Sequence, residues 1–433
     1  MLGFIPRDKG IFVDPPEYLR FMSNVAATIQ HAHVHLSPGK EKSLMRGHPW
    51  VFSGAIGKIE VDEAEPAAGD WVRVIAASGA FIGWGHWGTG SIAVRLLSRE
   101  DAPAPPNADW WTGHLSACLD VRKHAGLYGS DEANANGFRW IHGEGDGLSG
   151  LVVDFYAGLA VVQTHSMGMH RALPEIVTGL KNAMPSLKGV VNKSTSLLKK
   201  LNEAGAEDGS DGWLWSDDDM PLPHPFLEHG LQYEVDPIAG QKTGFFLDQR
   251  ENRRLLMEMV GDRSVLNAFS YTGGFSMAAL RGGSSHVVSL DASQAAVNLA
   301  SRHAELNGFS SRHEAICGDV LHHLKSVDTL PEVVILDPPA YAKSRNARHK
   351  AVQGYKRLNE TALRKMPSGG LLWTFSCSQV VDAQLFEDTI VAAAIASGRK
   401  VRILKRLGQP ADHPTMAGHS EARYLKGLIL HIG

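Results

Sequence analysis

Cysteine is scarce in this sequence. The 433 residues include three cysteines, Cys118, Cys317 and Cys377, which are scattered along the chain and form no Cys-x-x-Cys motif or Cys/His pairing typical of a zinc site. This pattern excludes a disulfide framework and gives no indication of a zinc site. We therefore expect reduced thiols and no bound metal.

Long apolar segments and an excess of one charge are also missing. The longest apolar runs have the length of a strand or a short helix, and residues 1–20 lack the features of a signal peptide. We therefore expect a soluble, cytoplasmic protein without membrane contact. A net charge of −3 argues against a basic coat for nucleic acid but leaves room for one local basic surface.

What the chain does contain is enough apolar sequence for a large core. With 43% apolar residues, it is long enough for two or three domains. After residues 1–30, which show no clear periodicity, short strand-like runs separated by Gly/Ser turns predict a small β-barrel or sandwich over 31–105. We expect a middle α+β domain over 106–222 and a third domain over 223–433.

Three features organise the middle domain. The stretch "DWWTGHLSACLDVRKHAG" has helical spacing, with Asp109 as its expected N-cap. Two apolar runs joined across "YAG" predict a hairpin. The acidic, glycine-rich segment 203–221 is typical of a solvated loop or domain junction.

From residue 223 onward, apolar strands alternate with helices. The runs "RSVLNAFS", "HVVSLD", "HEAICGD", "EVVILD" and "GLLWTFS" are separated by helical segments. Such alternation predicts an α/β domain with a doubly wound parallel sheet, whose ligands bind outside the C-terminal ends of the strands.

Polar residues stand at those strand ends. Gly273 and Gly274 precede a helix, where the absence of Cβ allows a ligand to approach the backbone. Asp291 ends the next strand, close to the spacing of about 20 residues at which a carboxylate reaches the hydroxyls of a ribose. Asp291 could equally cap the following helix, and the two roles are compatible.

Three further strand ends carry candidate residues. Asp319 is either a turn residue or an acceptor for the exocyclic amine of a base. Asp337 is followed by two prolines, which fix a rigid, extended exit from the strand and indicate a functional carboxylate. Cys377 lies between Ser376 and Ser378 at the end of another strand, whereas Cys118 and Cys317 are expected to be buried in the core.

The motifs "KTGFFLDQRENRR", "NAFSYTGGFSMAAL", "VVSLDAS", "VVILDPPAYAKS" and "TFSCSQVV", in this order, resemble those of class I S-adenosylmethionine-dependent methyltransferases of bacterial large-subunit ribosomal RNA. More narrowly, they are similar to the cytosine carbon-5 methyltransferases that carry an N-terminal PUA domain. The resemblance covers about residues 31–433, with "GHPWVFSGAI" in the PUA part and "GEGDGLSGLVVDFY" in the middle domain. It implies a Rossmann-like methyltransferase sheet, S-adenosylmethionine as cofactor and large-subunit rRNA as partner, and it leaves a homodimer open.

The resemblance also implies roles for individual residues. Cys377 would be the nucleophile, and Asp337 would stand between cofactor and target base. Asp291 would hold the ribose and Asp319 the adenine amine. The residues that the resemblance implies around the cofactor are Phe246, Gln249, Asn267, Ala268, Ser270, Tyr271, Gly273, Asp291, Ala292, Asp319 and Asp337.

A cysteine suits this chemistry because carbon 5 of cytosine is a poor nucleophile. A thiolate that adds to carbon 6 makes carbon 5 reactive, and the thiol is expelled later. RNA would be held by the acid-free tract 343–357, where the expected contacts are Lys343, Arg345, Arg348 and Lys350. Tyr341 could stack on the target base or belong to the core.

Two other functions fit parts of the sequence. "DPPAY" also resembles the motif of adenine-amino methyltransferases, which need no cysteine. A non-catalytic RNA-binding protein with a vestigial cofactor domain is the second alternative. The presence of Asp291, Asp337 and Cys377 argues against it.

Overall fold

The computed structural model describes residues 31–61, 64–128, 134–199, 211–217, 220–240, 243–342 and 344–433. The chain forms two compact units. Of the described residues, the first unit comprises those within 31–45, 50–116 and 158–220, and the second comprises those within 46–49, 117–157 and 221–433. None of the helices in the described ranges combines the length and the apolar character that crossing a membrane requires. The domain boundaries at residues 30, 105 and 222 stay predictions.

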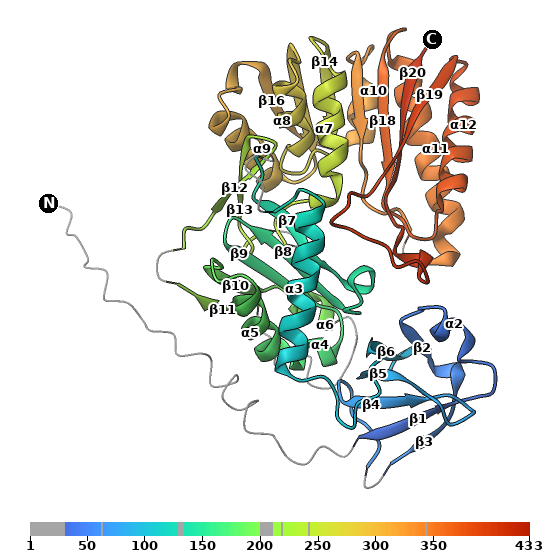
Figure 1. Ribbon diagram of the computed structural model, residues 1–433. Helices are drawn as coiled ribbons and strands as arrows, with labels where there is room; N and C mark the ends of the chain where they lie inside the picture. Colours follow the sequence, from blue (N-terminus) through green and yellow to red (C-terminus); the bar gives the residue numbers. More distant parts are fainter. Residues whose placement is uncertain are drawn as a thin grey trace, which may run out of the picture. The chain divides into compact units, whose positions relative to one another are not determined.

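The first unit contains a six-stranded sheet with the order β2-β6-β5-β4-β1-β3 (Figure 1). Its strands are β1 (Ala32–Leu36), β2 (Trp50–Phe52), β3 (Ile56–Glu60), β4 (Trp71–Ile75), β5 (Phe81–Trp87) and β6 (Ile92–Ser98). Apolar residues at alternate positions, such as Val72 and Val74, are fully buried, as the period of a strand requires. The strand-like runs expected at β4, β5 and β6 are confirmed.

The rest of the first unit is a smaller set of strands and short helices. They are α2 (Lys42–Met45), η1 (Ser53–Ala55), β9 (Leu159–Thr164), α4 (Met167–Arg171), α5 (Leu173–Ala183), β10 (Gly189–Asn192), α6 (Thr195–Leu198) and β11 (Gly212–Ser216). β10 pairs parallel with β9 and antiparallel with β11. The solvated loop expected over 203–221 is therefore wrong at β11, where Trp213 and Trp215 pair with β10. The other expectation for this segment, a domain junction, agrees with the change from the first unit to the second between Met220 and Pro221. Residues 203–210 and 218–219 of that segment lie outside the described residues.

The helix expected from "DWWTGHLSACLDVRKHAG" is α3 (Ala108–His124). Its N-cap is not Asp109, which lies within the first turn. Asn107 takes that place, because its Oδ1 accepts from the backbone N–H of Trp110 at 3.0 Å. Asparagine and aspartate are comparable N-caps, so composition alone could not separate the two positions.

The second unit contains two hairpin pairs, β7 with β8 and β12 with β13, and a seven-stranded sheet. The elements before that sheet are β7 (Gly137–His142), η3 (Gly143–Asp146), β8 (Leu151–Tyr156), β12 (His224–Glu228), β13 (Leu231–Val235) and η5 (Leu247–Gln249). The sheet and its helices are α7 (Arg250–Met259), β14 (Ser264–Ala268), α8 (Gly274–Arg281), β15 (His286–Asp291), α9 (Gln294–Leu306), η6 (Ser310–Arg312), β16 (His313–Cys317), α10 (Val320–Ser326), β17 (Val333–Leu336), η7 (Arg345–Ala347), α11 (Arg348–Lys365), β18 (Leu371–Ser376), α12 (Ala383–Ser397), β19 (Val401–Gly408), η8 (Ser420–Ala422) and β20 (Lys426–Ile432).

The strand order of the large sheet is β16-β15-β14-β17-β18-β20-β19. The five strands from β16 to β18 are parallel, as predicted. β20 runs antiparallel to both β18 and β19, so the sheet is not wholly parallel. β20 follows β19 without an intervening crossover helix, and a direct return of this kind gives antiparallel pairing.

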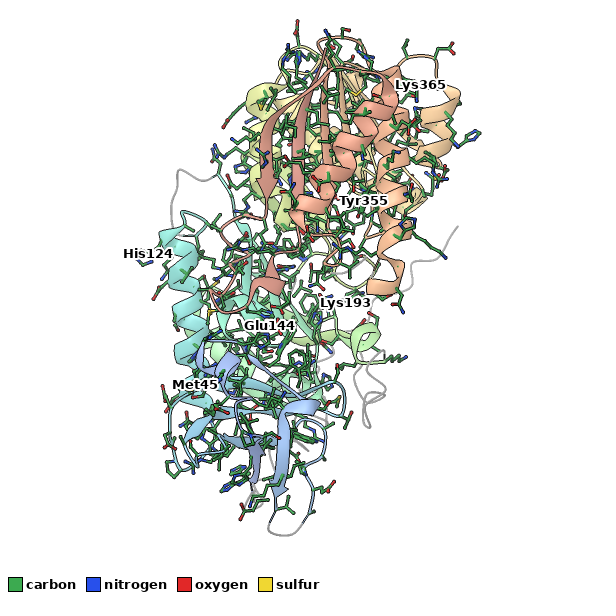
Figure 2. All side chains as sticks on the ribbon, turned by 90° about the vertical axis from the view of Figure 1, so that its right-hand side faces the viewer. Met45, His124, Glu144, Lys193, Tyr355 and Lys365 are labelled. Atoms are coloured by element: carbon green, nitrogen blue, oxygen red, sulfur yellow. The ribbon has the colours of Figure 1, made fainter. Side chains whose placement is uncertain are left out.

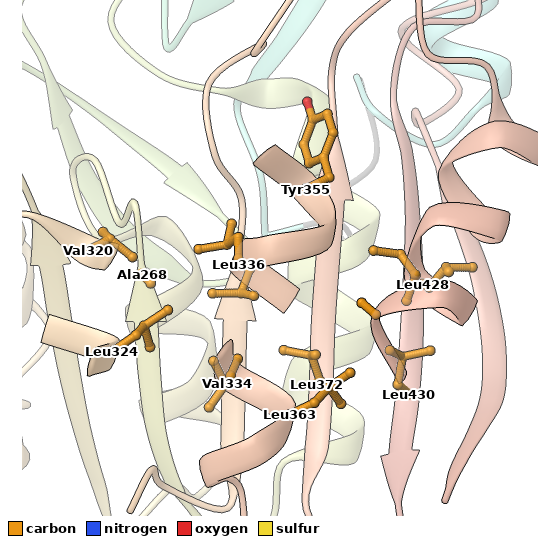
Figure 3. Packing of buried hydrophobic residues seen from close by; sticks show 14 of the residues in the cluster. Ala268, Val320, Leu324, Val334, Leu336, Tyr355, Leu363, Leu372, Leu428 and Leu430 are labelled. Carbon is orange, nitrogen blue, oxygen red and sulfur yellow. The ribbon is translucent and has the colours of Figure 1, made fainter. Parts of the chain in front are cut away.

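Helices cover both faces of this sheet. α7 to α9 pack on one another, and so do α10 to α12. Val334 and Leu336 belong to the core beneath α10, α11 and α12, where Leu324, Tyr355 and other apolar side chains meet them (Figure 3). On the opposite face the ring of Phe375 lies 5.5 Å from that of Phe275 in α8. The two cores confirm the expected doubly wound arrangement.

A buried ion pair joins the β12–β13 hairpin to α7. Arg253 donates from Nε and Nη2 to the two carboxylate oxygens of Glu228 at 2.6 and 2.8 Å. Burial acts to raise the pKa of Glu228, but the guanidiniums of Arg253 and Arg250 outweigh it and the net pKa is lowered. The stabilisation from this carboxylate is therefore present above its ordinary pKa of 4.5 and is lost as the pH falls through its lowered pKa.

Replacing this carboxylate should destabilise the protein strongly. Glu228→Gln leaves the Arg253 guanidinium buried without its counter-charge, which we expect to lower the free energy of unfolding by about 3–5 kcal/mol. Urea unfolding followed by circular dichroism measures the change. The matched control is Glu258→Gln, which removes an exposed partner of Arg254 and should cost less than about 0.5 kcal/mol. Equal effects of the two substitutions would contradict this account.

Candidate functional site

The predicted polar strand ends meet at one edge of the seven-stranded sheet. β14 lies between β15 and β17, and β18 pairs with β17, all in parallel. Their carboxyl ends therefore share an edge. Asn267 and Ala268 end β14, Asp291 ends β15, Asp337 follows β17 and Cys377 follows β18.

The loop after β14 turns sharply towards Asp291. Phe269 and Tyr271 have φ angles of 60° and 47°, in the left-handed region that non-glycine residues seldom adopt. The Asp291 carboxylate compensates, because its Oδ2 accepts from the Tyr271 N–H at 2.9 Å. The strained loop is thus fixed by the residue that the sequence singled out as a ribose ligand.

Asp291 is not the cap of α9. Ser293 holds that position, and its side chain accepts from the N–H of Ala296. Asp291 Oδ1 instead accepts from the N–H of Ser293 at 2.9 Å. A carboxylate has about four lone-pair sites, so the two backbone bonds leave capacity for hydroxyl donors.

Asp319 does act as a helix cap. It is exposed, and its Oδ1 accepts from the N–H of His322 at 2.7 Å to begin α10. Its other oxygen can still accept from a ligand.

Ala292, which follows Asp291, is exposed, and its carbonyl accepts from the thiol of Cys317 at 3.5 Å.

The glycine at the start of α8 serves the fold directly. Gly273 has φ +79°, and a Cβ at this position would lie 2.9 Å from the Cβ of Ala300 in α9. Asn267 is also committed to the fold, because its amide donates to Ser276 Oγ at 2.9 Å. These two residues shape the loop.

Two hydroxyls in the same loop have no partner among the described residues. Ser270 Oγ and Thr272 Oγ1 are both buried and without a hydrogen-bond partner. Buried polar groups are normally hydrogen-bonded, so unpaired hydroxyls in a glycine loop are what a bound polar ligand would satisfy.

The "TGFFLDQR" segment lies against this loop. The ring of Phe246 meets that of Tyr271 edge to face at 5.0 Å, and the Tyr271 hydroxyl donates to the Gly244 carbonyl at 3.2 Å. Gln249 donates from Nε2 to Asp337 Oδ2 at 3.0 Å. Asn252 orients this amide, since its Nδ2 donates to Gln249 Oε1 at 2.6 Å. The structure therefore brings Phe246 to Tyr271 and Gln249 to Asp337.

Two buried residues that sequence reasoning missed hold these loops in place. Arg253 donates from Nη1 to the Phe246 carbonyl at 2.9 Å. His303 accepts at Nε2 from the N–H of Glu234 at 3.0 Å, so its Nδ1 carries the proton and donates to the Thr272 carbonyl at 2.8 Å. Burial lowers the pKa of His303, which favours this neutral form. A histidine on the apolar face of α9 was the only signal in the sequence.

Cys377 is half-buried at the mouth of β18, and the flanking serines hold that strand end. Ser376 Oγ donates to the Tyr355 hydroxyl at 2.9 Å, and Ser378 Oγ donates to the Ala342 carbonyl at 2.7 Å. Tyr355 comes from α11, and Figure 2 labels it together with Lys365, the last residue of that helix. Burial is the main cause that raises the pKa of Tyr355 to about 12, and nearby Cys377 and Asp337 add to it.

The other cysteines differ from one another. Cys118 is buried as predicted, and burial raises its pKa to about 12. The prediction for Cys317 is wrong, because it is exposed. Cys317 ends β16, the outermost strand of the sheet, and none of the described strands pairs with its outer side.

Residues 348–357 of the basic tract form the first part of α11. Arg348 and Lys350 are exposed, and Arg348 pairs with Asp382 at 3.2 Å. Lys343 lies outside the described residues, as does the side chain of Arg345. Tyr341 packs its ring 4.7 Å from that of Tyr355, so it belongs partly to the core.

Known families and relatives match most of this chain. The family model described as S-adenosylmethionine-dependent methyltransferase matches residues 140–430, and that described as PUA-like domain matches residues 34–99. A protein named ribosomal RNA large subunit methyltransferase I from Alteromonas mediterranea is 36% identical over 93% of this chain and 99% of the relative. A protein of the same name from Vibrio parahaemolyticus is 36% identical over 93% of this chain and 99% of its own length.

Solved structures share the fold. A Streptococcus mutans structure described as a SAM-dependent methyltransferase has a TM-score of 0.76 at 21% identity, covering 92% of this chain and 99% of its own. A methyltransferase structure complexed with SAH has a TM-score of 0.77 at 21% identity, with the same coverage. The resemblance drawn from the motifs and the expected fold class are confirmed.

The residues at the sheet edge fit the cofactor named by the matching family model. Asp291 has acceptor capacity for a ribose diol, and the unpaired Ser270 and Thr272 hydroxyls lie in the adjoining loop. Phe246 and Tyr271 offer aromatic surface beside them. The loop itself is shaped by Asn267, Ala268 and Gly273. On the β17 side of β14, Gln249 is hydrogen-bonded to Asp337.

Removing the Asp291 charge should weaken cofactor binding. Asp291→Asn loses acceptor capacity for the ribose while keeping the size of the side chain, and we expect S-adenosylmethionine to bind about 1–3 kcal/mol more weakly. Isothermal titration calorimetry on the full chain measures it. Ser293→Ala, which removes the α9 cap without changing the carboxylate, is the control and should bind normally. Unchanged affinity in Asp291→Asn would refute the ribose assignment.

Proposed function

Because the chain belongs to the S-adenosylmethionine-dependent methyltransferase family, we propose that it methylates carbon 5 of a cytosine in large-subunit ribosomal RNA, with Cys377 as the nucleophile. The observation that carries this proposal is the placement of a half-buried thiol at the carboxyl end of β18, next to the strand that ends at Asp337. The large-subunit rRNA named for relatives 36% identical over 93% of the chain supports the substrate class.

The thiol supplies what the pyrimidine ring lacks. Cys377 loses its proton and its sulfur adds to carbon 6 of the cytosine, which leaves electron density at carbon 5. When bound, S-adenosylmethionine supplies an electrophilic methyl group. Removal of the carbon 5 proton then lets the C–S bond break and returns the free thiolate.

Asp337 would act at the boundary between cofactor and base. Its Oδ2 is held by Gln249, and the two prolines after it restrict the backbone on its far side. This carboxylate can accept from an exocyclic amine of the target base and so orient the ring. The amide of Gln249 is itself oriented by Asn252, so the carboxylate is prepared before the base arrives.

The alternative of adenine-amino methylation finds less support. In that chemistry the aromatic residue of "DPPAY" stacks on the flipped base. Here Tyr341 packs on Tyr355, and Gly354 of α11 is so close to the Tyr341 ring that a Cβ there would lie 2.9 Å from it.

RNA would contact the start of α11. Arg348 and Lys350 lie exposed within a tract that follows Asp337 directly and contains no acid. Lys343 and Arg345 belong to the same tract and remain predicted contacts. The target base must leave its stack to reach Cys377, so the substrate would present it in a loop or in a helix that opens.

A covalent trap tests the nucleophile. Large-subunit rRNA fragments made with 5-fluorocytosine should form a complex with the full chain that survives denaturing electrophoresis, because fluorine cannot leave from carbon 5 as a proton does. Cys377→Ala should form no such complex and should not methylate, yet it should still bind RNA and cofactor.

Cys317→Ala is the matched control for this trap. It removes an exposed thiol outside the proposed site and should trap RNA as the wild type does. Substantial methylation by Cys377→Ala, or a methyl group on an adenine amine, would show that the cytosine assignment is wrong.

The RNA surface is tested by salt dependence. In a variant with Arg348→Gln and Lys350→Gln, the plot of log binding constant against log salt should become shallower by about 0.7 for each phosphate that the protein no longer neutralises. Cofactor affinity should not change. Lys405→Gln, at an exposed position on the edge strand β19, is the control. A slope equal to that of the wild type would mean that this tract is only a solvated helix face.

A further inference from the structure

A lysine that the proposed mechanism does not use lies at the mouth of β18. Lys426 is the first residue of β20, and its backbone position pairs with Ser376, the residue before Cys377. β20 therefore begins where β18 ends. The pairing brings a cation to the strand end that carries the proposed nucleophile.

The ammonium of Lys426 is tied to the backbone around Cys377. Its Nζ donates to the carbonyl of Ser378, the residue after Cys377, and to the carbonyl of Tyr424 at 2.9 Å. A lysine ammonium has three N–H donors, so a third is left.

Lys426 is an unusual residue to bury. It is 7% exposed, and among the described residues no carboxylate comes within ion-pair distance of it. Burial lowers its pKa to about 8, while Cys377 and Asp382 act in the opposite direction. Its placement at this strand end is fixed by the pairing with Ser376 and by the hydrogen bond to the Ser378 carbonyl. A buried cation without an ion-pair partner is costly unless an anion compensates it.

Anchoring the strand end does not require this charge. Ser378 is already held through its hydroxyl by the Ala342 carbonyl, and its N–H donates to Ser376 Oγ at 3.3 Å. Ser376 in turn donates to Tyr355. The distinct contribution of Lys426 is a positive charge at the strand end that carries the thiol, and a nearby cation is a common means of favouring a thiolate.

We propose that Lys426 is a positioning residue for the methyl transfer, which fixes the backbone beside Cys377 and stabilises its thiolate before the thiolate adds to the base. The thiol proton passes to solvent, and no other bond changes in this step. This inference rests on the proposed role of Cys377. The other titratable groups around the pair are Tyr355 on α11, Asp337 after β17 and Asp382 at the start of α12.

The rate at which iodoacetamide alkylates Cys377, followed against pH by peptide mass spectrometry, tests this inference without RNA or cofactor. The measurement uses the full chain with Cys317→Ser, which removes the exposed competing thiol. Since the thiolate is the reacting species, the midpoint of the profile reports its formation. Lys426→Met and Lys426→Gln should both raise the midpoint by about one pH unit or more.

The set of variants separates charge from anchoring. Lys426→Gln keeps a donor for the carbonyls but lacks the charge, whereas Lys426→Arg keeps the charge and should retain a midpoint close to that of the wild type. Unchanged midpoints in Lys426→Gln and Lys426→Met would overturn the inference. Unchanged midpoints together with trapping of 5-fluorocytosine RNA by the wild type would leave the proposed function standing, whereas a wild type that traps no RNA would overturn the nucleophile assignment on which this inference rests.

Discussion

Parallel pairing of four adjacent strands is the constraint on which the site depends. β15, β14, β17 and β18 run side by side in one direction, so the residues that follow them meet at a single edge. A shift of one residue in any strand would turn its side chains to the opposite face. The fully buried strand β17, with helices packed on both faces, makes such a shift costly.

Around this edge, buried polar groups hold loops that the strands alone would leave unfixed. His303 fixes the Thr272 carbonyl, Arg253 fixes the Phe246 carbonyl, and Gln249 fixes Asp337. Each of these groups is largely removed from water, so losing one partner leaves the other unsatisfied at a cost of about 1–3 kcal/mol. The hydrogen bonds that stabilise the second unit therefore also fix the positions of the site residues.

Lys426 belongs to the same edge of the sheet, on β20, which pairs with β18 on the side away from β17. β20 lies between β18 and β19 and runs antiparallel to both. This arrangement pairs Lys426, the first residue of β20, with Ser376 of β18. The same arrangement makes the sheet mixed. A departure from the parallel pattern thus brings a cation to the strand end that carries Cys377.

Sequence reasoning found the elements whose pattern is local. β17 and β18 are continuous apolar runs, and the strand ends at Asp291, Asp337 and Cys377 follow from the parallel alternation. β19 and β20 were not found, because most β19 residues are exposed and the described residues between the two strands form no crossover α-helix.

Single residues were harder to place than strands. Burial of Cys317 was predicted wrongly because its place on the outermost strand depends on strand order, which the sequence does not state. The roles of Arg253, His303 and Lys426 depend on contacts to residues 7 to 69 positions away in the sequence. No local sequence pattern identifies the partners in these contacts. The motifs that resemble a methyltransferase family supplied most of the site because they mark the strand ends directly.

The most direct measurement of the central claim is the modified nucleoside itself. Large-subunit rRNA from cells with and without this protein, digested and mapped by mass spectrometry, should differ at one cytosine that carries a carbon 5 methyl group only when the protein is present. Restoring the wild-type gene should return that methyl group, and restoring Cys377→Ala should not. A methylated adenine in its place, or an unchanged nucleoside map, would contradict the assignment of Cys377 as the nucleophile of a cytosine methyltransferase.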